Sequence, residues 1–210
     1  MKSFFNGAYL AFRSFVVNYL QANLENDVGL AFIYFNYKEQ QTLTHVLGSL
    51  LQQLIQQQER VSREISALYG SCDDGKRPPT SGELATLLQS QSQFFSKLFI
   101  VIDALDECSY NATPELLLQL QKLRPSLHLL ITSRSHVGNV IQQFLPDANR
   151  LEIRAHDEDI KKYLDKRIRI ERHLGPWVTK SPDLGETIKE KIAEKAKGMS
   201  VHPYPLSRFL

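Results

Sequence analysis

At its most apolar point the sequence reads Leu98-Phe99-Ile100-Val101-Ile102-Asp103-Ala104-Leu105-Asp106-Glu107-Cys108. The apolar run at 98–102 is typical of a strand that is covered on both faces, as strands of parallel sheets are. Ligands of open α/β sheets bind at the carboxyl ends of such strands. We therefore predict that the acidic residues Asp103, Asp106 and Glu107 lie at a functional edge of a sheet.

Strand and helix patterns alternate on both sides of this segment. Apolar, β-rich runs predict further strands at 28–35 and 127–132, and a weaker fourth at 150–154. Apolar residues at helical spacing fill the stretches between them, and from Asp157 onward the pattern is helical throughout. The alternation predicts the α/β fold class, with a three-layer architecture of a parallel sheet and helices on both faces.

Glutamine is concentrated in the helix predicted over 42–58. The apolar side of this helix contains Val46, Leu47, Leu50, Leu51 and Leu54. Glutamines occupy positions 52, 53, 56, 57 and 58. We expect them to form the solvated face of the helix.

Composition and charge exclude several classes of protein. With 210 residues, 42% hydrophobic and 23% charged, the chain has the composition of a globular domain. The net charge of +2 gives no dense basic surface for a nucleic-acid partner. Two cysteines form no disulfide framework, and no Cys/His spacing suits zinc. No run of 18 apolar residues could cross a bilayer, so we expect no membrane partner. Arg13 interrupts the apolar stretch near the N-terminus and no small-x-small cleavage site follows, so we expect a cytoplasmic protein.

The acidic residues after the strand suit nucleotide chemistry. Asp103 would hold Mg²⁺ through its water shell, and Asp106 or Glu107 would orient an attacking water. The D-x-x-D-E spacing disfavours a D-x-D phosphotransferase. Strand ends also carry acidic residues in solvated turns, and that alternative stays open.

The next predicted strand ends in Thr132-Ser133-Arg134. Neighbouring strands of a parallel sheet end at the same edge, so the planar Arg134 guanidinium could reach a γ-phosphate there. The alternative is an arginine that is simply solvated at a strand exit.

Four blocks of sequence in this order resemble the NACHT-type, STAND-class signal-transduction NTPases, in their fungal branch with a nephrocystin-like N-terminal P-loop domain. The blocks are 28–40, 101–108, 130–134 and 151–160. The resemblance covers about residues 12 to 199 and implies a P-loop NTPase-like sheet. It also implies a switch driven by Mg²⁺ and ATP or GTP, which associates with itself or with other STAND-type subunits. Full-length relatives carry repeat domains such as ankyrin repeats.

This resemblance implies roles for the strand-end residues. Asp103 would be the magnesium and cofactor-binding carboxylate, Asp106 and Glu107 the catalytic acids, and Arg134 the cofactor-binding phosphate sensor. Nucleotide hydrolysis would be the ancestral activity of such a chain.

The sequence departs from the family at the phosphate-binding loop. A P-loop needs G-x-x-x-x-G-K-[ST] before a helix, but residues 3–12 contain one glycine and no lysine. A near match at 70–77 is rejected because Arg77 replaces the hydroxyl residue and Pro78-Pro79 prevent a helix from opening there. We therefore expect a fragment truncated at the Walker A end, with defective nucleotide binding.

Domain organisation follows from the missing loop. We predict a partial P-loop NTPase core at 1–155 and a truncated helical extension at 156–210, in which Pro203 and Pro205 exclude a regular helix. Three adjacent strands are expected in the order 28–35, 98–103, 127–132, with the fourth closing the gap or packing imperfectly. Without the P-loop strand, an apolar edge should lie open beside 127–132.

Two other functions stay open at this stage. The chain could be a nucleotide-independent scaffold or oligomerisation module in which the acidic cluster is a relic, or a non-functional truncated gene product. Hydrolysis by the acidic residues with metal alone is the least favoured, since no histidine accompanies them.

Overall fold

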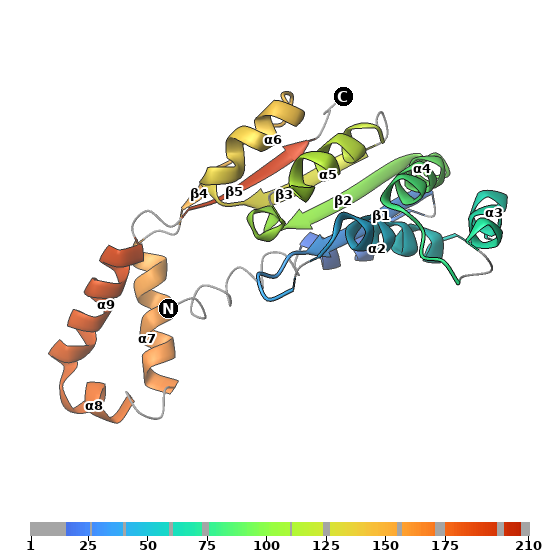
Figure 1. The fold of residues 1–210 in the computed structure, drawn as a ribbon. Helices are drawn as coiled ribbons and strands as arrows, with labels where there is room; N and C mark the ends of the chain where they lie inside the picture. The colour runs from blue at the N-terminus through green and yellow to red at the C-terminus, as the bar shows by residue number, and fades with distance from the viewer. Residues whose placement is uncertain are drawn as a thin grey trace. The chain divides into compact units, whose positions relative to one another are not determined.

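The computed structural model describes residues 16–25, 27–39, 41–58, 61–72, 76–109, 111–123, 127–154, 157–170, 175–196 and 200–206. The chain divides into two compact units (Figure 1). The first unit comprises Met1–Leu151 with His202–Leu210, and the second comprises Glu152–Val201. The prediction of a partial NTPase core at 1–155 and a helical extension at 156–210 divides the chain by function, and it stays a prediction.

A parallel sheet forms the centre of the first unit. Its strands are β1 (Val28–Tyr34), β2 (Lys97–Asp103) and β3 (Leu127–Ser133), paired in the order β1-β2-β3. The predicted α/β class, the parallel pairing and the order of these three strands are confirmed. The register aligns Tyr34 with Asp103 and Ile102 with Ile131, so the carboxyl ends of the three strands meet at one edge.

Alternation along each strand divides the core between two layers of helices. One face packs against α2 (Leu43–Gln56), α4 (Ser81–Ser92), α5 (Ala112–Gln121) and α6 (Gly138–Phe144). Its fully buried residues include Leu50, Leu88, Leu98, Ile100, Ile102, Leu116 and Leu120. The other face packs against the helical turns at 16–22, where Val17 contacts Leu30 and Val101. The short helix α3 (Arg63–Ser71) packs beside α4.

A further strand, β5 (Ser200–Leu206), pairs antiparallel with β3, from Leu129 opposite Leu206 to Ser133 opposite His202. The expectation of an open edge beside β3 is therefore wrong. Pro203 and Pro205 exclude a helix, as predicted, but proline is compatible with a strand where its missing N–H would face away from the partner. A C-terminal strand thus covers the edge that the sequence left open.

The second unit is mainly helical. It contains α7 (Asp157–Ile170), α8 (Gly175–Lys180) and α9 (Pro182–Ala196), together with the two-residue strand β4 (Ile153–Arg154). The strand predicted at 150–154 is thus shorter than expected, and it pairs antiparallel with Ser200 and Val201 at the start of β5. Ile160, Leu164, Ile168 and Ala193 form the buried side of the helices. None of the described helices combines the length and the apolar character that a bilayer span requires.

The solvated face predicted for the glutamines at the end of α2 is wrong at Gln53 and Gln58, which are only partly exposed. The amide groups of Gln53 and Gln57 hydrogen-bond to the backbone of β1, at Phe32 and Leu30 respectively. Gln52, Gln56 and Gln57 are exposed, as expected, although the Gln57 amide also bonds to β1. Long-range contacts of this kind leave no trace in local hydrophobic periodicity.

Gly29 lies where β1 approaches the loop before β2. A Cβ atom at this position would lie 2.9 Å from Cγ of Phe95 and 3.1 Å from Cδ1 of Leu98. We expect Gly29→Ala to lower the free energy of unfolding by about 1–3 kcal/mol, because the buried ring must shift. Urea denaturation followed by circular dichroism measures this change. Gly82→Ala in α4 is the control, since nothing lies within 4 Å of its Cβ position; equal losses in both variants would contradict the packing.

Helix α4 begins with the capping box predicted from Thr80 and Glu83, both halves of which are present. Arg77 also donates to both carboxylate oxygens of Glu83, at 2.8 and 3.1 Å. Hydrogen bonds from Arg77 and then from Thr80 lower the pKa of Glu83 from 4.5 to about 2.

A pH titration of the Glu83 carboxyl resonance should therefore have its midpoint near 2. Because the folded-state pKa is lowered, the stabilisation is present above pH 4.5 and is lost as the pH falls toward 2. Arg77→Ala should raise the midpoint toward 4.5, since it removes the largest cause of the shift. An unchanged midpoint in this variant would show that the ion pair does not form in solution.

Candidate functional site

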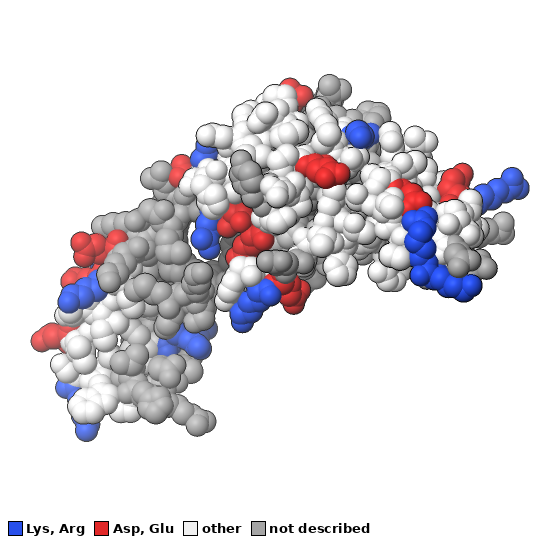
Figure 2. Space-filling view, in the orientation of Figure 1, with Lys and Arg blue, Asp and Glu red and all other residues white. Residues whose placement is uncertain are grey.

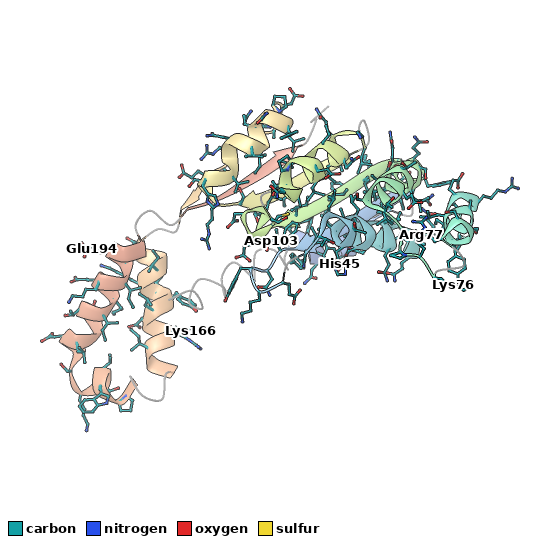
Figure 3. The ribbon with its side chains drawn as sticks, viewed as in Figure 1. His45, Lys76, Arg77, Asp103, Lys166 and Glu194 are labelled. Atoms are coloured by element: carbon teal, nitrogen blue, oxygen red, sulfur yellow. The ribbon has the colours of Figure 1, made fainter. Side chains whose placement is uncertain are left out.

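The candidate site begins at the last residue of β2. Asp103 ends this strand with only 1% of its surface exposed (Figure 3). Its backbone carbonyl accepts a hydrogen bond from the Phe35 N–H at 3.0 Å, so β1 and β2 stay paired up to the carboxylate. The rigid sheet therefore fixes the position of the Asp103 backbone.

Thr132 fixes the Asp103 side chain from the neighbouring strand. Its hydroxyl donates to Oδ1 of Asp103 at 2.6 Å, a distance typical of a hydrogen bond to an ionised carboxylate. The same Oγ1 accepts from the N–H of Ala104 at 3.0 Å. One buried hydroxyl thus joins the ends of β2 and β3.

The chain turns sharply after Asp103. Ala104 has φ 56° and ψ 48°, which is the left-handed conformation that residues other than glycine rarely adopt. For alanine this conformation costs about 1–2 kcal/mol. A short 3₁₀ turn over Leu105–Glu107 follows, and the fully buried Leu105 anchors it. The strained residue is compatible with a site whose geometry is imposed by its surroundings.

Asp106 lies against the exit of β3. Its Oδ1 accepts from the backbone N–H of Arg134 at 3.1 Å, and its Oδ2 lies 3.2 Å from Nε of Arg134. The Asp106 side chain is 7% exposed, whereas that of Arg134 is 60% exposed. The structure therefore brings Asp106 and Arg134 together, with the carboxylate buried and the guanidinium at the surface.

Glu107 has a different neighbour. Its Oε2 accepts from the backbone N–H of Tyr37 at 2.8 Å, which ties the turn after β2 to the loop after β1. Cys108 follows in sequence, and burial raises the pKa of its thiol.

The sequence predicted that Asp103 supplies the protein's carboxylate in a magnesium–nucleotide site. Proteins bind Mg²⁺ through one or two carboxylates together with substrate phosphates. Within the described ranges no group of three His, Cys, Asp or Glu side chains could hold a metal ion by itself. The predicted donor Asp103 would therefore need phosphate oxygens and water to complete the coordination. Residues 3–12, where the phosphate loop was sought, lie outside the described residues.

Part of the rejected P-loop match at 70–77 has a structural role. Arg77 ends this stretch and pairs with Glu83 at the start of α4 (Figure 3). Positions 73–75 lie outside the described residues. On the face drawn in Figure 2, the Lys and Arg side chains of the described residues are interspersed with Asp and Glu.

Thr132 is the site residue whose role the sequence did not reveal. The sequence predicted only that Thr132 lies at the end of a strand, before Ser133 and Arg134. The available signal was a hydroxyl residue at the end of a strand adjacent to one that ends in aspartate. Parallel pairing then places the two side chains within hydrogen-bonding distance.

The fold and the strand-end residues define an α/β domain with a polar site at the carboxyl edge of its parallel sheet. The family described as Nephrocystin 3, N-terminal, matches residues 11–134, more than half of the chain. The chain belongs to this family. The match includes β1, β2 and β3 and ends at Arg134, so Asp103, Asp106, Glu107 and Arg134 all lie within it. Neither the curated proteins nor the solved structures gave a significant match.

We predict that Thr132→Val lowers the free energy of unfolding by about 1–3 kcal/mol, because it removes a hydrogen bond from a buried carboxylate and another from a backbone N–H. Chemical denaturation at pH 7 measures the loss. Thr132→Ser keeps the hydroxyl and should lose less. A Thr132→Val variant within about 0.5 kcal/mol of the wild type would show that the hydroxyl does not bridge the strands.

Proposed function

We propose that this chain is part of a NACHT-type, STAND-class nucleotide-dependent switch and that these 210 residues bind nucleotide only weakly. The proposal rests on one observation: the parallel sheet brings Asp103, Asp106 and Arg134 to a single edge, in a domain of the nephrocystin 3 N-terminal family. A cytoplasmic location and association with like subunits belong to the same proposal.

Asp103 is the proposed magnesium carboxylate. Its burial and its hydrogen bond from Thr132 support this role, because both fix one oxygen and limit the orientations of the other. Bound Mg²⁺ would neutralise phosphate charge, and the metal would be held through water rather than by a protein cage.

Glu107 is the proposed water-orienting acid. Asp106 was the other candidate, but both of its oxygens are engaged by Arg134. This double contact supports a positioning role for Asp106, which orients the guanidinium of Arg134 through Nε. Arg134 is the proposed phosphate sensor, and its exposure leaves the side chain accessible to an anionic ligand.

Weak binding follows from the sequence. The 210 residues contain no G-x-x-x-x-G-K-[ST] motif, whose backbone amides and lysine normally cradle the phosphates. The carboxylates and Arg134 alone supply few attractive contacts to a triphosphate. A nucleotide-independent scaffold is the competing function, and it has some support because Asp106 and Glu107 already have partners within the fold.

Amide resonances can detect binding too weak for calorimetry. On titration with Mg-ATP or Mg-GTP, we expect the amides of Ala104 and Arg134 to shift with a Kd above about 1 mM. Asp103→Asn should abolish the shifts, because it removes the proposed metal carboxylate.

Asp27→Asn is the matched control. It removes the same charge just before β1, at the amino ends of the strands, and should leave the shifts intact. Micromolar affinity would overturn the claim of weak binding. Resonances that do not move at any nucleotide concentration would favour the scaffold.

A further inference from the structure

Among the strands that the structure describes, β1 lies at the end of the sheet and pairs with β2. In a parallel pair, alternate residues direct their backbone N–H and C=O groups toward the partner strand. Phe35 donates to β2 through its N–H, which places the odd-numbered residues of β1 on the β2 side. The N–H and C=O groups of Leu30 and Phe32 therefore face away from β2, where a further strand could pair.

The side chains of Gln53 in α2 and of Gln57, the C-cap residue of this helix, occupy that outer side. The Gln57 amide accepts from the Leu30 N–H at 2.9 Å and donates to the Leu30 carbonyl at 2.6 Å. The Gln53 amide accepts from the Phe32 N–H at 3.0 Å and donates to the Phe32 carbonyl at 2.8 Å. Each primary amide thus makes the pair of bonds that one residue of an antiparallel neighbouring strand would make.

The spacing of the two glutamines matches the spacing of the strand. Residues four apart on a helix are separated by about 6 Å along its axis. Residues two apart on a strand are separated by about 6.6 Å. Gln53 and Gln57 are therefore spaced to reach Phe32 and Leu30 together. Their order is reversed relative to the strand, as expected for a helix that runs antiparallel to it.

The first outward N–H of β1 is also satisfied within the chain, because Val28 donates to the carbonyl of Glu25 at 3.1 Å. Internal partners are thus present at Val28, Leu30 and Phe32, the first three of the four outward positions of β1. A strand arriving from outside would have to displace them.

An open β1 edge would favour self-association because of the amino-acid composition of this strand. Its sequence, Val-Gly-Leu-Ala-Phe-Ile-Tyr, has no charge and no proline. Short apolar, β-rich segments without charge or proline pair readily with copies of themselves. The natural occupant of an open β1 edge is therefore the β1 strand of a second copy of this chain.

We propose that Gln53 and Gln57 act as a substitute strand that closes the β1 edge against a second copy of the chain. The glutamines are then specificity residues for self-association: they confine it to surfaces other than β1. This function does not depend on nucleotide and goes beyond the proposed switch.

Hydrogen exchange on the wild-type chain is the first test. The amides of Leu30 and Phe32 should be protected at protein concentrations where β1 has no intermolecular partner, as is the amide of Ala31, which faces β2. We call the hydrogen bonds of Gln53 and Gln57 to the backbone of β1 the clamp. If the Leu30 and Phe32 amides exchange like exposed amides while the Ala31 amide stays protected, the clamp does not exist in solution and the proposal fails. This measurement requires no variant.

The second test compares two double variants of the same helix. Gln53→Ala/Gln57→Ala removes the clamp. Gln52→Ala/Gln56→Ala makes the same change, at the same spacing, at the neighbouring positions, which are exposed as Gln57 also is. At low concentration the clamp variant should exchange the Leu30 and Phe32 amides about tenfold faster than the control, because each has lost a hydrogen bond.

Light scattering after size exclusion, over a range of concentrations, gives the decisive result. The clamp variant should form larger assemblies at concentrations where the wild type and the control variant do not, and Leu30 and Phe32 should regain protection in them. A folded clamp variant with the same mass as the control at every concentration would overturn the proposal. If the clamp variant does not fold, the single variant Gln57→Ala is judged by the same criterion.

Discussion

The parallel pairing of β2 with β1 on one side and β3 on the other is the constraint on which the first unit depends. The register sets Tyr34 opposite Asp103 and Ile102 opposite Ile131, so the strands end together. Because the ends meet, a hydroxyl on β3 can bond to a carboxylate on β2, and Asp106 can hold the arginine that leaves β3. Every proposed site residue follows from that alignment.

A parallel sheet of three strands also has two edges whose backbone groups need partners. The two edges are closed in different ways. Glutamine amides from α2 satisfy the outer groups of β1, while the antiparallel strand β5 pairs along β3. Both edges of the three-strand parallel sheet thus have partners within the described residues. Strand β5 covers the β3 edge that was predicted to lie open.

Features that are determined by neighbouring residues could be predicted from the sequence, whereas contacts between residues far apart in the chain could not. Continuous apolar runs identify buried strands, and strand ends locate candidate ligands, so the order β1-β2-β3 and the nephrocystin-like family were accessible from sequence. Pairs formed by distant residues were not: Gln57 with Leu30 and Thr132 with Asp103 depend on tertiary packing. The left-handed Ala104 was hidden because alanine rarely adopts this conformation. Strand β5 was missed because its prolines argue against regular structure.

The most direct test of the alignment of strand ends is a double-mutant cycle between Asp103→Asn and Thr132→Val, read as the free energy of unfolding. Residues in direct contact typically couple by about 0.5–3 kcal/mol. We predict a coupling energy in that range, because the 2.6 Å bond joins the two side chains. Losses that add to within about 0.5 kcal/mol would show that the two residues are independent, and would contradict the arrangement of the site.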